Sequence, residues 1–183
     1  MLRRLLYGGV IFASTMGLSN CGCDPVPPFI DFSEIDVHAL QTEIEIEDTL
    51  FFYIDPSNPT YIGQLIYEAF APQKAFATKC VGPGDQGMKF PIEEMNIIST
   101  KDFDSEHPAG SSLNDLFLLK TFSDYVPLSD SLINSNRLNF GQYDVQVILN
   151  QPPNLSNEHT FLFELIKSNQ EVILGRSEEI TWK

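Results

Sequence analysis

The chain has 183 residues and a formal net charge of −14, with 25 acidic and 11 basic side chains. This charge disfavours nucleic acid as a partner and direct attraction to an anionic lipid surface, because both need clustered Lys and Arg. A hydrophobic content of 43% with 14 Phe predicts a globular chain, and the length is that of one domain.

The N-terminus reads MLRRLLYGGVIFASTMGLSNC. Arg3 and Arg4 precede a mostly apolar run, Leu5 to Leu18, which is typical of a signal peptide. A transmembrane helix needs about 20 apolar residues, and this run is shorter and contains glycine. We therefore expect residues 1–20 to be an export signal.

The segment Leu18-Ser19-Asn20-Cys21 resembles the lipobox of bacterial lipoproteins, although Asn20 differs from the usual Gly, Ala or Ser. The resemblance implies cleavage before Cys21 and attachment of acyl chains, including palmitate, to this residue, with Cys23 as the alternative site. Two or more acyl chains give stable anchoring. The expected location is the outer membrane, on its periplasmic face, because no acidic run follows Cys21; surface exposure and a soluble periplasmic protein are the alternatives.

Lipidation of Cys21 leaves two cysteines, Cys23 and Cys80, in a compartment that permits disulfides. A bridge between them is one hypothesis, and it would stabilise the domain by roughly 4 kcal/mol in the chain-entropy model. The alternative is a buried thiol at Cys80 and an unbridged Cys23. Metal binding through the two N-terminal cysteines is disfavoured because no Cys or His cluster completes a set of four ligands.

Residues 21–28 contain the sequence DPVPP, which predicts a stiff tether, and residues 29–183 are expected to form one domain. Alternating Ile and Glu in TEIEIED (42–48) predict a strand with its isoleucines on one face. Apolar runs at 50–54 and 61–70, separated by the turn residues DPSNP, predict two further strands.

Strands are also predicted at 90–99 and 143–150, and the chain ends in a predicted hairpin around Ser168-Asn169 whose last strand runs from Val172 to Trp182. Helical signals are few. Ser112 and Asp115 resemble a capping box before the apolar run within 111–119, and one more helical turn is expected at 130–133.

The predicted fold is therefore mainly β: a single β-sandwich, immunoglobulin-like, with one or two short helical turns. The Cys, Trp, Cys spacing of many immunoglobulin domains is absent. The stretch IISTKDFDSEHPAGSSLNDLF (97–117) and the Phe-rich hairpin resemble small uncharacterised lipoproteins of Gram-negative bacteria. That resemblance implies an extracytoplasmic β domain and carries no activity.

Asp102, Asp104 and Glu106 stand at alternate positions, as the first calcium ligands of an EF-hand do. The glycine expected at the sixth position is replaced by His107, and no Glu stands at the twelfth, so a solvated acidic loop is favoured over a calcium site. No cofactor motif is present, because VGPGDQG (81–87) lacks dinucleotide and P-loop spacing.

No nucleophile, base and metal set can be named from the sequence, so we expect a protein that is not an enzyme. The favoured function is a membrane-anchored interaction or structural module whose partner is an envelope protein. The alternative is a lipoprotein that binds a glycan or calcium. The aromatic residues that could contact a sugar in that alternative are Tyr53, Tyr61, Tyr67, Tyr125 and Tyr143.

Overall fold

The computed structural model describes residues 27, 29–63, 82–121, 123–128 and 145–183. These residues form the strands β1 (Phe29–Asp31), β2 (Glu34–Ala39), β3 (Glu43–Ile44), β4 (Leu50–Ser57), β5 (Thr60–Ile62), β6 (Ile92–Ser99), β7 (Phe117–Lys120), β8 (Tyr125–Pro127), β9 (Val145–Leu149), β10 (Glu158–His159), β11 (Phe161–Lys167), β12 (Val172–Arg176) and β13 (Ile180–Trp182), and one 3-10 turn, η1 (Asn114–Leu116).

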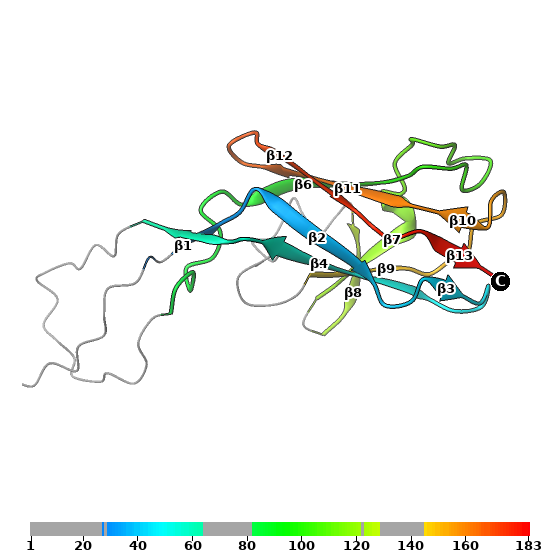
Figure 1. Cartoon of the computed structure of the whole chain (residues 1–183), viewed down its shortest axis with the longest axis horizontal. Coiled ribbons are helices and arrows are strands. Elements are labelled where there is room, and N and C mark those ends of the chain that lie inside the picture. The colour runs from blue at the N-terminus through cyan, green and yellow to red at the C-terminus, as the bar shows by residue number, and fades with distance from the viewer. Residues whose placement is uncertain (1–26, 28, 64–81, 122, 129–144) are drawn as a thin grey trace, which may run out of the picture.

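The larger sheet is antiparallel and has five strands in the order β2-β4-β9-β7-β8. A three-stranded sheet, β12-β11-β6, packs against it, and the chain continues directly from β10 into β11 and from β12 towards β13 (Figure 1). A second three-stranded sheet, β10-β13-β3, extends this hairpin, and β1 pairs with β5. The predicted mainly β, sandwich-like fold is confirmed.

Phenylalanine side chains fill the space between the sheets. Phe52 of β4 contacts Phe161 and Phe163 of β11, with ring centroids 5.2 and 5.3 Å apart in edge-to-face geometry. Phe117 of β7 lies 6.0 Å from Phe161, and Trp182 lies 6.3 Å from it. Such aromatic pairs stabilise a core beyond the area that they bury, so these rings join the two sheets.

The first part of the domain crosses from one sheet to the other. β2 pairs with β4, whereas β3 pairs in parallel with β13. Upstream of that parallel pair, β2 and β12 are edge strands of different sheets that lie close together. A Cβ atom on Gly175 would lie 2.7 Å from Val37 Cγ2 and 2.8 Å from Ile35 Cδ1, so only glycine fits at this approach.

Lys167 fixes the start of this crossing segment. Its side chain is 0% exposed, and its ammonium group donates to Asp31 Oδ1 (2.7 Å), to Glu171 Oε2 (3.0 Å) and to the carbonyl of Phe32. The same nitrogen lies 5.3 Å from the centre of the Phe32 ring. A buried charge is tolerated only when it is paired and hydrogen-bonded, and this one joins the end of β11 to the residues just before β2.

The strand predictions at 90–99 and in the terminal hairpin are confirmed by β6, β11 and β12. The hairpin turn contains Gln170 with φ 67°, but the last strand is interrupted, because β12 ends at Arg176 and β13 begins at Ile180. The predicted alternation over 42–48 is wrong beyond Ile44. Ile46 is 56% exposed, because a turn closed by Asp48 N–H and the Glu45 carbonyl ends the strand.

The helical signal predicted within 111–119 corresponds to a single 3-10 turn, η1 (Asn114–Leu116). Ser112 is not a helix cap; it forms an isolated bridge with Ile98 of β6. Within 111–119 the helical part is η1, and the chain then enters β7, whose Phe117 and Leu119 are buried at a period of two. Pairing of β7 with β9 and burial of these side chains outweigh the local capping signal.

The three cysteines, the turn predicted at 130–133 and most of the strand predicted at 61–70 lie outside the described residues. Of the predicted tether, only Pro27 is described. Within the described ranges, no helix is long and apolar enough to cross a membrane.

Candidate binding groove between β2 and β12

The backbone of β2 has a side that does not face β4. Leu40 N–H donates to the Phe51 carbonyl at 3.0 Å, and the antiparallel register continues through the pair His38↔Tyr53. In such a ladder the intervening residues direct both of their backbone polar groups outward. The N–H and C=O groups of Ile35 and Val37 therefore point away from β4, and within the described part of the chain β2 pairs with β4 alone.

The same argument applies to β12. Lys167 N–H donates to the Glu171 carbonyl and Ser177 N–H donates to the Phe161 carbonyl, both at 2.9 Å, which fixes the phase of the β11–β12 ladder. Leu174 and Arg176 consequently direct their backbone groups away from β11. Two edge strands thus present backbone donors and acceptors on the same side of the sandwich.

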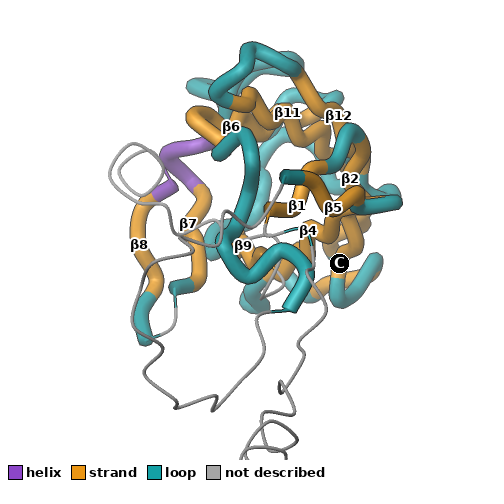
Figure 2. Tube along the Cα trace, turned by 90° about the vertical axis from the view of Figure 1, so that its left-hand side faces the viewer, coloured by secondary structure: helices purple, strands orange, loops and turns teal. Residues whose placement is uncertain are grey.

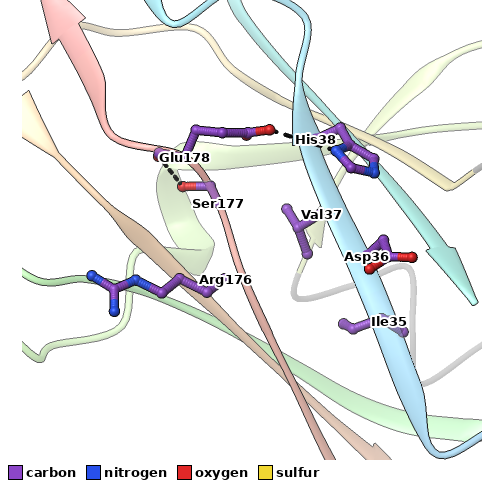
Figure 3. A pocket seen from close by; sticks show the side chains of 7 residues that line it. All are labelled: Ile35, Asp36, Val37, His38, Arg176, Ser177 and Glu178. Carbon is purple, nitrogen blue, oxygen red and sulfur yellow. Dashed lines mark hydrogen bonds and ion pairs between the residues drawn. The ribbon is translucent and has the colours of Figure 1, made fainter. Parts of the chain in front are cut away.

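A groove of about 310 Å³ lies between these edges. It is lined by Ile35, Asp36, Val37, His38, Arg176, Ser177 and Glu178. Figure 3 shows the side chains of Ile35 and Val37 on the side of β2 that faces β12, whereas Asp36, His38 and Arg176 point away from the groove. Both aliphatic side chains belong to the core, since Ile35 is 7% and Val37 4% exposed, so the groove offers mainly the backbone groups of its two edges, and its charged side chains form the rim.

Glu178 closes one end of the groove. Its Oε2 accepts from Ala39 N–H at 3.2 Å, and its Oε1 lies 3.5 Å from His38 Nδ1. Burial raises the pKa of Glu178, but hydrogen bonds from its own N–H and that of Ala39, together with His38, lower the pKa below its ordinary value. Glu178 is thus the carboxylate that bridges β2 to the residues following β12.

This arrangement suits an extended peptide better than a sugar or a cation. Among the described residues that line the groove, none carries a phenyl, phenol or indole ring on which a sugar could stack. The carboxylate of Asp36 is turned outward and accepts from the Ser57 hydroxyl, so it does not converge with Glu178 on a cation. A strand added to an exposed edge takes its affinity from backbone hydrogen bonds of the kind available here.

In the acidic loop, the carboxylates of Asp102 and Asp104 accept hydrogen bonds from donors of the same loop. Asp104 Oδ1 accepts from the N–H groups of Glu106 and His107 and lies 2.8 Å from His107 Nδ1. Asp102 Oδ1 accepts from Ala109 N–H at 2.7 Å. These oxygens bind donors of their own loop, and within the described residues no group of three or more His, Cys, Asp or Glu side chains is arranged to hold a metal ion.

His107 is the centre of this loop. Its Nδ1 contacts Asp104, and its Nε2 lies 3.2 Å from both carboxylate oxygens of Asp115. Burial lowers the pKa of His107, but the hydrogen bond to Asp104 and the charges of Asp115 and Asp104 outweigh it, so the pKa is raised. A protonated ring donates from both nitrogens, which matches the two carboxylates.

Sequence reasoning missed a buried Ser–His pair. Ser99 Oγ lies 2.7 Å from His159 Nδ1, and His159 Nε2 lies 2.9 Å from the Ser156 carbonyl. A carbonyl only accepts, so we assign the ring proton to Nε2 and the Nδ1 lone pair to the Ser99 hydroxyl. Burial lowers the pKa of His159, and both side chains are at most 1% exposed. The pair satisfies polar groups in the core, and no local sequence signal marks it.

The other predicted contact residues do not gather at one place. Tyr53 lies on β4, where its hydroxyl accepts from Gln146, while Tyr125 lies on β8 and Tyr61 on β5. Tyr67 and Tyr143 lie outside the described residues, as do Cys21, Cys23 and Cys80. No protein-family model matches this chain, and no curated protein matches it at a significant level.

Proposed function

We propose that this protein is a non-catalytic interaction module that binds an extended segment of an envelope protein in the groove between β2 and β12. The observation that carries the proposal is the pair of adjacent edge strands whose outward backbone groups border one groove. Edge strands of this kind are templates for pairing with another chain. An added strand takes its affinity from backbone hydrogen bonds, and the outward backbone groups of β2 and β12 border this groove.

The strand orders support the immunoglobulin-like part of the fold prediction. The order β2-β4-β9-β7 corresponds to the A, B, E and D strands of such domains, and β6-β11-β12 corresponds to C, F and G. β8 extends the larger sheet beyond this pattern. A fold of this type hosts many functions, so the proposal depends on the groove and not on the fold.

We also propose that a lipid anchor holds this module on a membrane. A signal peptide over residues 1–20 and lipidation of Cys21 would place the module on the outer membrane, facing the periplasm. The test is mass spectrometry of the membrane fraction from cells that express the wild type and Cys21→Ser. The proposal requires an acylated N-terminal peptide in the wild type alone; a soluble, unmodified wild type would refute it.

The groove can be tested by photo-cross-linking in intact cells. A benzoylphenylalanine is placed at Asp36 or at Arg176, whose side chains stand at opposite rims, and at Tyr125 as a control. Tyr125 is 47% exposed and lies on β8, the edge strand of the larger sheet opposite β2. We expect the two rim positions to trap the same protein and the control position to trap none of it.

The opposite result would remove the proposal. If all three positions trap the same set of proteins, the contacts are not specific to the groove. If the rim positions trap no protein while purified protein is stabilised by calcium or an oligosaccharide, the ligand-binding alternative takes its place, since a ligand that binds only the folded state raises the melting temperature.

A further inference from the structure

The edge strand on the other side of the sandwich, β6, is bonded by a segment of the same chain. In the β6–β11 ladder, Leu162 pairs with Ile98 and Glu164 pairs with Asn96. The backbone groups of Leu162 and Glu164 point towards β6, because those of the neighbouring β11 residues bond to β12. Met95, Ile97 and Ser99 therefore direct their backbone groups outward, away from β11.

Residues 110–114 bond the carbonyls of all three of these residues and the N–H group of Ile97. Gly110 N–H donates to the Ser99 carbonyl at 2.9 Å, and Leu113 N–H donates to the Ile97 carbonyl at 2.8 Å. Gly110 has φ +83°, which favours glycine at the start of this segment.

The side chain of Asn114 completes the cover. Its Oδ1 accepts from Ile97 N–H at 2.9 Å, and its Nδ2 donates to the Met95 carbonyl at 2.7 Å. One side-chain amide thus bonds two consecutive outward residues of the edge, as the peptide group of a neighbouring strand would. Asn114 opens η1, which contacts β7 and β8 and lies between them and β6 (Figure 2).

The segment is attached at both ends. The side chain of Leu113 is fully buried in the core, and so is that of Phe103 at the far end of the acidic loop. The carboxylate of Asp115, the residue after Asn114, lies 3.2 Å from His107 Nε2. The other ring nitrogen of His107 contacts Asp104. The acidic loop therefore holds the residue next to the Asn114 amide.

We propose that residues 110–114 are an edge cover that prevents a second copy of this chain from pairing with β6, and that the Asn114 side chain is its essential group. An uncovered β6 edge could pair with the same edge of a second copy. If the two strands run antiparallel and centre on Asn96, Met95 of each copy lies opposite Ile97 of the other. Natural sheets avoid such edge-to-edge association by covering or charging their edges. Anchoring on a membrane would raise the local concentration of copies and make the cover more important.

The test compares Asn114→Ala with Asn157→Ala, which deletes an amide side chain from an exposed position. Amide hydrogen exchange is measured at Ile97, which faces the cover, and at Ile98, which faces β11. We expect Asn114→Ala to lower the protection of Ile97 roughly tenfold, the cost of one unsatisfied backbone group, and to leave Ile98 unchanged.

Self-association is measured on the same proteins by sedimentation velocity over a range of concentrations. The proposal expects dimers of Asn114→Ala, with protection of Ile97 regained as the dimer forms, and monomers of the wild type and Asn157→Ala. It is overturned if Ile97 keeps its protection, if Ile97 and Ile98 lose protection together, or if Asn114→Ala stays monomeric with an exposed Ile97 amide.

Discussion

The sandwich has edge strands on both sides, and the outward backbone groups of these strands differ in their bonding. At β6, the backbone groups that face away from β11 are bonded by Gly110, Leu113 and Asn114. At β2 and β12, the equivalent groups border a groove, and the backbone group of β2 that is bonded by a side chain from across it, among the described residues, is Ala39 N–H, which donates to Glu178.

The groove is therefore not a general property of the edge strands in this fold. The same chain covers β6 with five consecutive residues, although β6 and β2 are both edge strands of antiparallel pairs. Leaving backbone groups available at β2 and β12 therefore requires a separate reason, and binding of an extended partner is one. The following changes should alter one side of the sandwich and not the other.

The largest effect is expected at Lys167, which holds the segment entering β2. In Lys167→Met, the carboxylates of Asp31 and Glu171 and the Phe32 carbonyl lose their buried donor. Removing one partner of a buried ion pair costs about 3–5 kcal/mol, and the partial exposure of both carboxylates reduces this to about 3 kcal/mol here. Urea unfolding measures the free energy of unfolding.

Lys101→Met is the matched control for this change, because Lys101 pairs with Glu158 at 2.9 Å while 40% exposed. Exposed pairs contribute less than about 1 kcal/mol. Equal losses of stability in the two variants would contradict the stabilising role that we assign to the buried Lys167 ammonium group.

The next effect is expected at Gly175, where β12 approaches β2. In Gly175→Ala, the new methyl group would lie 2.7 to 2.8 Å from side-chain atoms of Val37 and Ile35. Overpacking of this kind costs about 1–3 kcal/mol. Thermal unfolding in a double-mutant cycle with Val37→Ala checks the cause, because the smaller side chain makes room and the two losses should sum to more than the loss of the double variant. Additive losses would contradict the contact.

The sequence predicted the parts of the fold that depend on local alternation. Phe161, Phe163 and Leu165 alternate with more exposed residues, and they form the inward face of β11 as expected. The same rule failed at Ile46, because alternation does not reveal that the Glu45–Asp48 turn ends the strand. The capping signal at Ser112 gave only the three-residue turn η1, because the long-range pairing of β7 with β9 outweighs local capping after it.

The groove could not have been predicted in this way. Ala39 and Glu178, which meet at its end, are 139 residues apart in the sequence, and neither stands in a recognisable motif. A glycine is needed at position 175 because the backbone there lies against the side chains of Ile35 and Val37, and this contact exists only once the two sheets have packed together. The acidic residues Asp102 and Asp104 were visible in the sequence, but their partners, which are backbone N–H groups of the same loop, were not.

A smaller, pH-dependent effect is expected on the covered side, at His107. Its folded pKa is raised above the ordinary 6.5, so its contribution to stability is complete below that pH and is lost as the pH rises through the folded pKa. The melting temperature of wild type should exceed that of His107→Gln by about 2–4 °C near pH 6, and the difference should shrink at alkaline pH. A difference independent of pH would show that the imidazolium does not hold the loop.

The smallest effect is expected at Glu178, whose side chain is 47% exposed. Glu178→Gln keeps an oxygen for Ala39 N–H and removes the charge, so the free energy of unfolding should fall by less than about 0.5 kcal/mol at neutral pH. Because its pKa is lowered, this contribution is present above the ordinary value of 4.5 and disappears as the pH falls.

Hydrogen exchange at Ala39 reports whether the groove side of the sandwich is open. Glu178→Ala should speed exchange at Ala39 without affecting Leu40, whose N–H bonds the Phe51 carbonyl. In the wild type, Ala39 should already exchange faster than Ile97, because an exposed carboxylate protects an amide less well than the half-buried Asn114 does. Equal protection of Ala39 and Ile97 would mean that both sides of the sandwich are closed, and a partner strand could not enter the groove without first displacing Glu178.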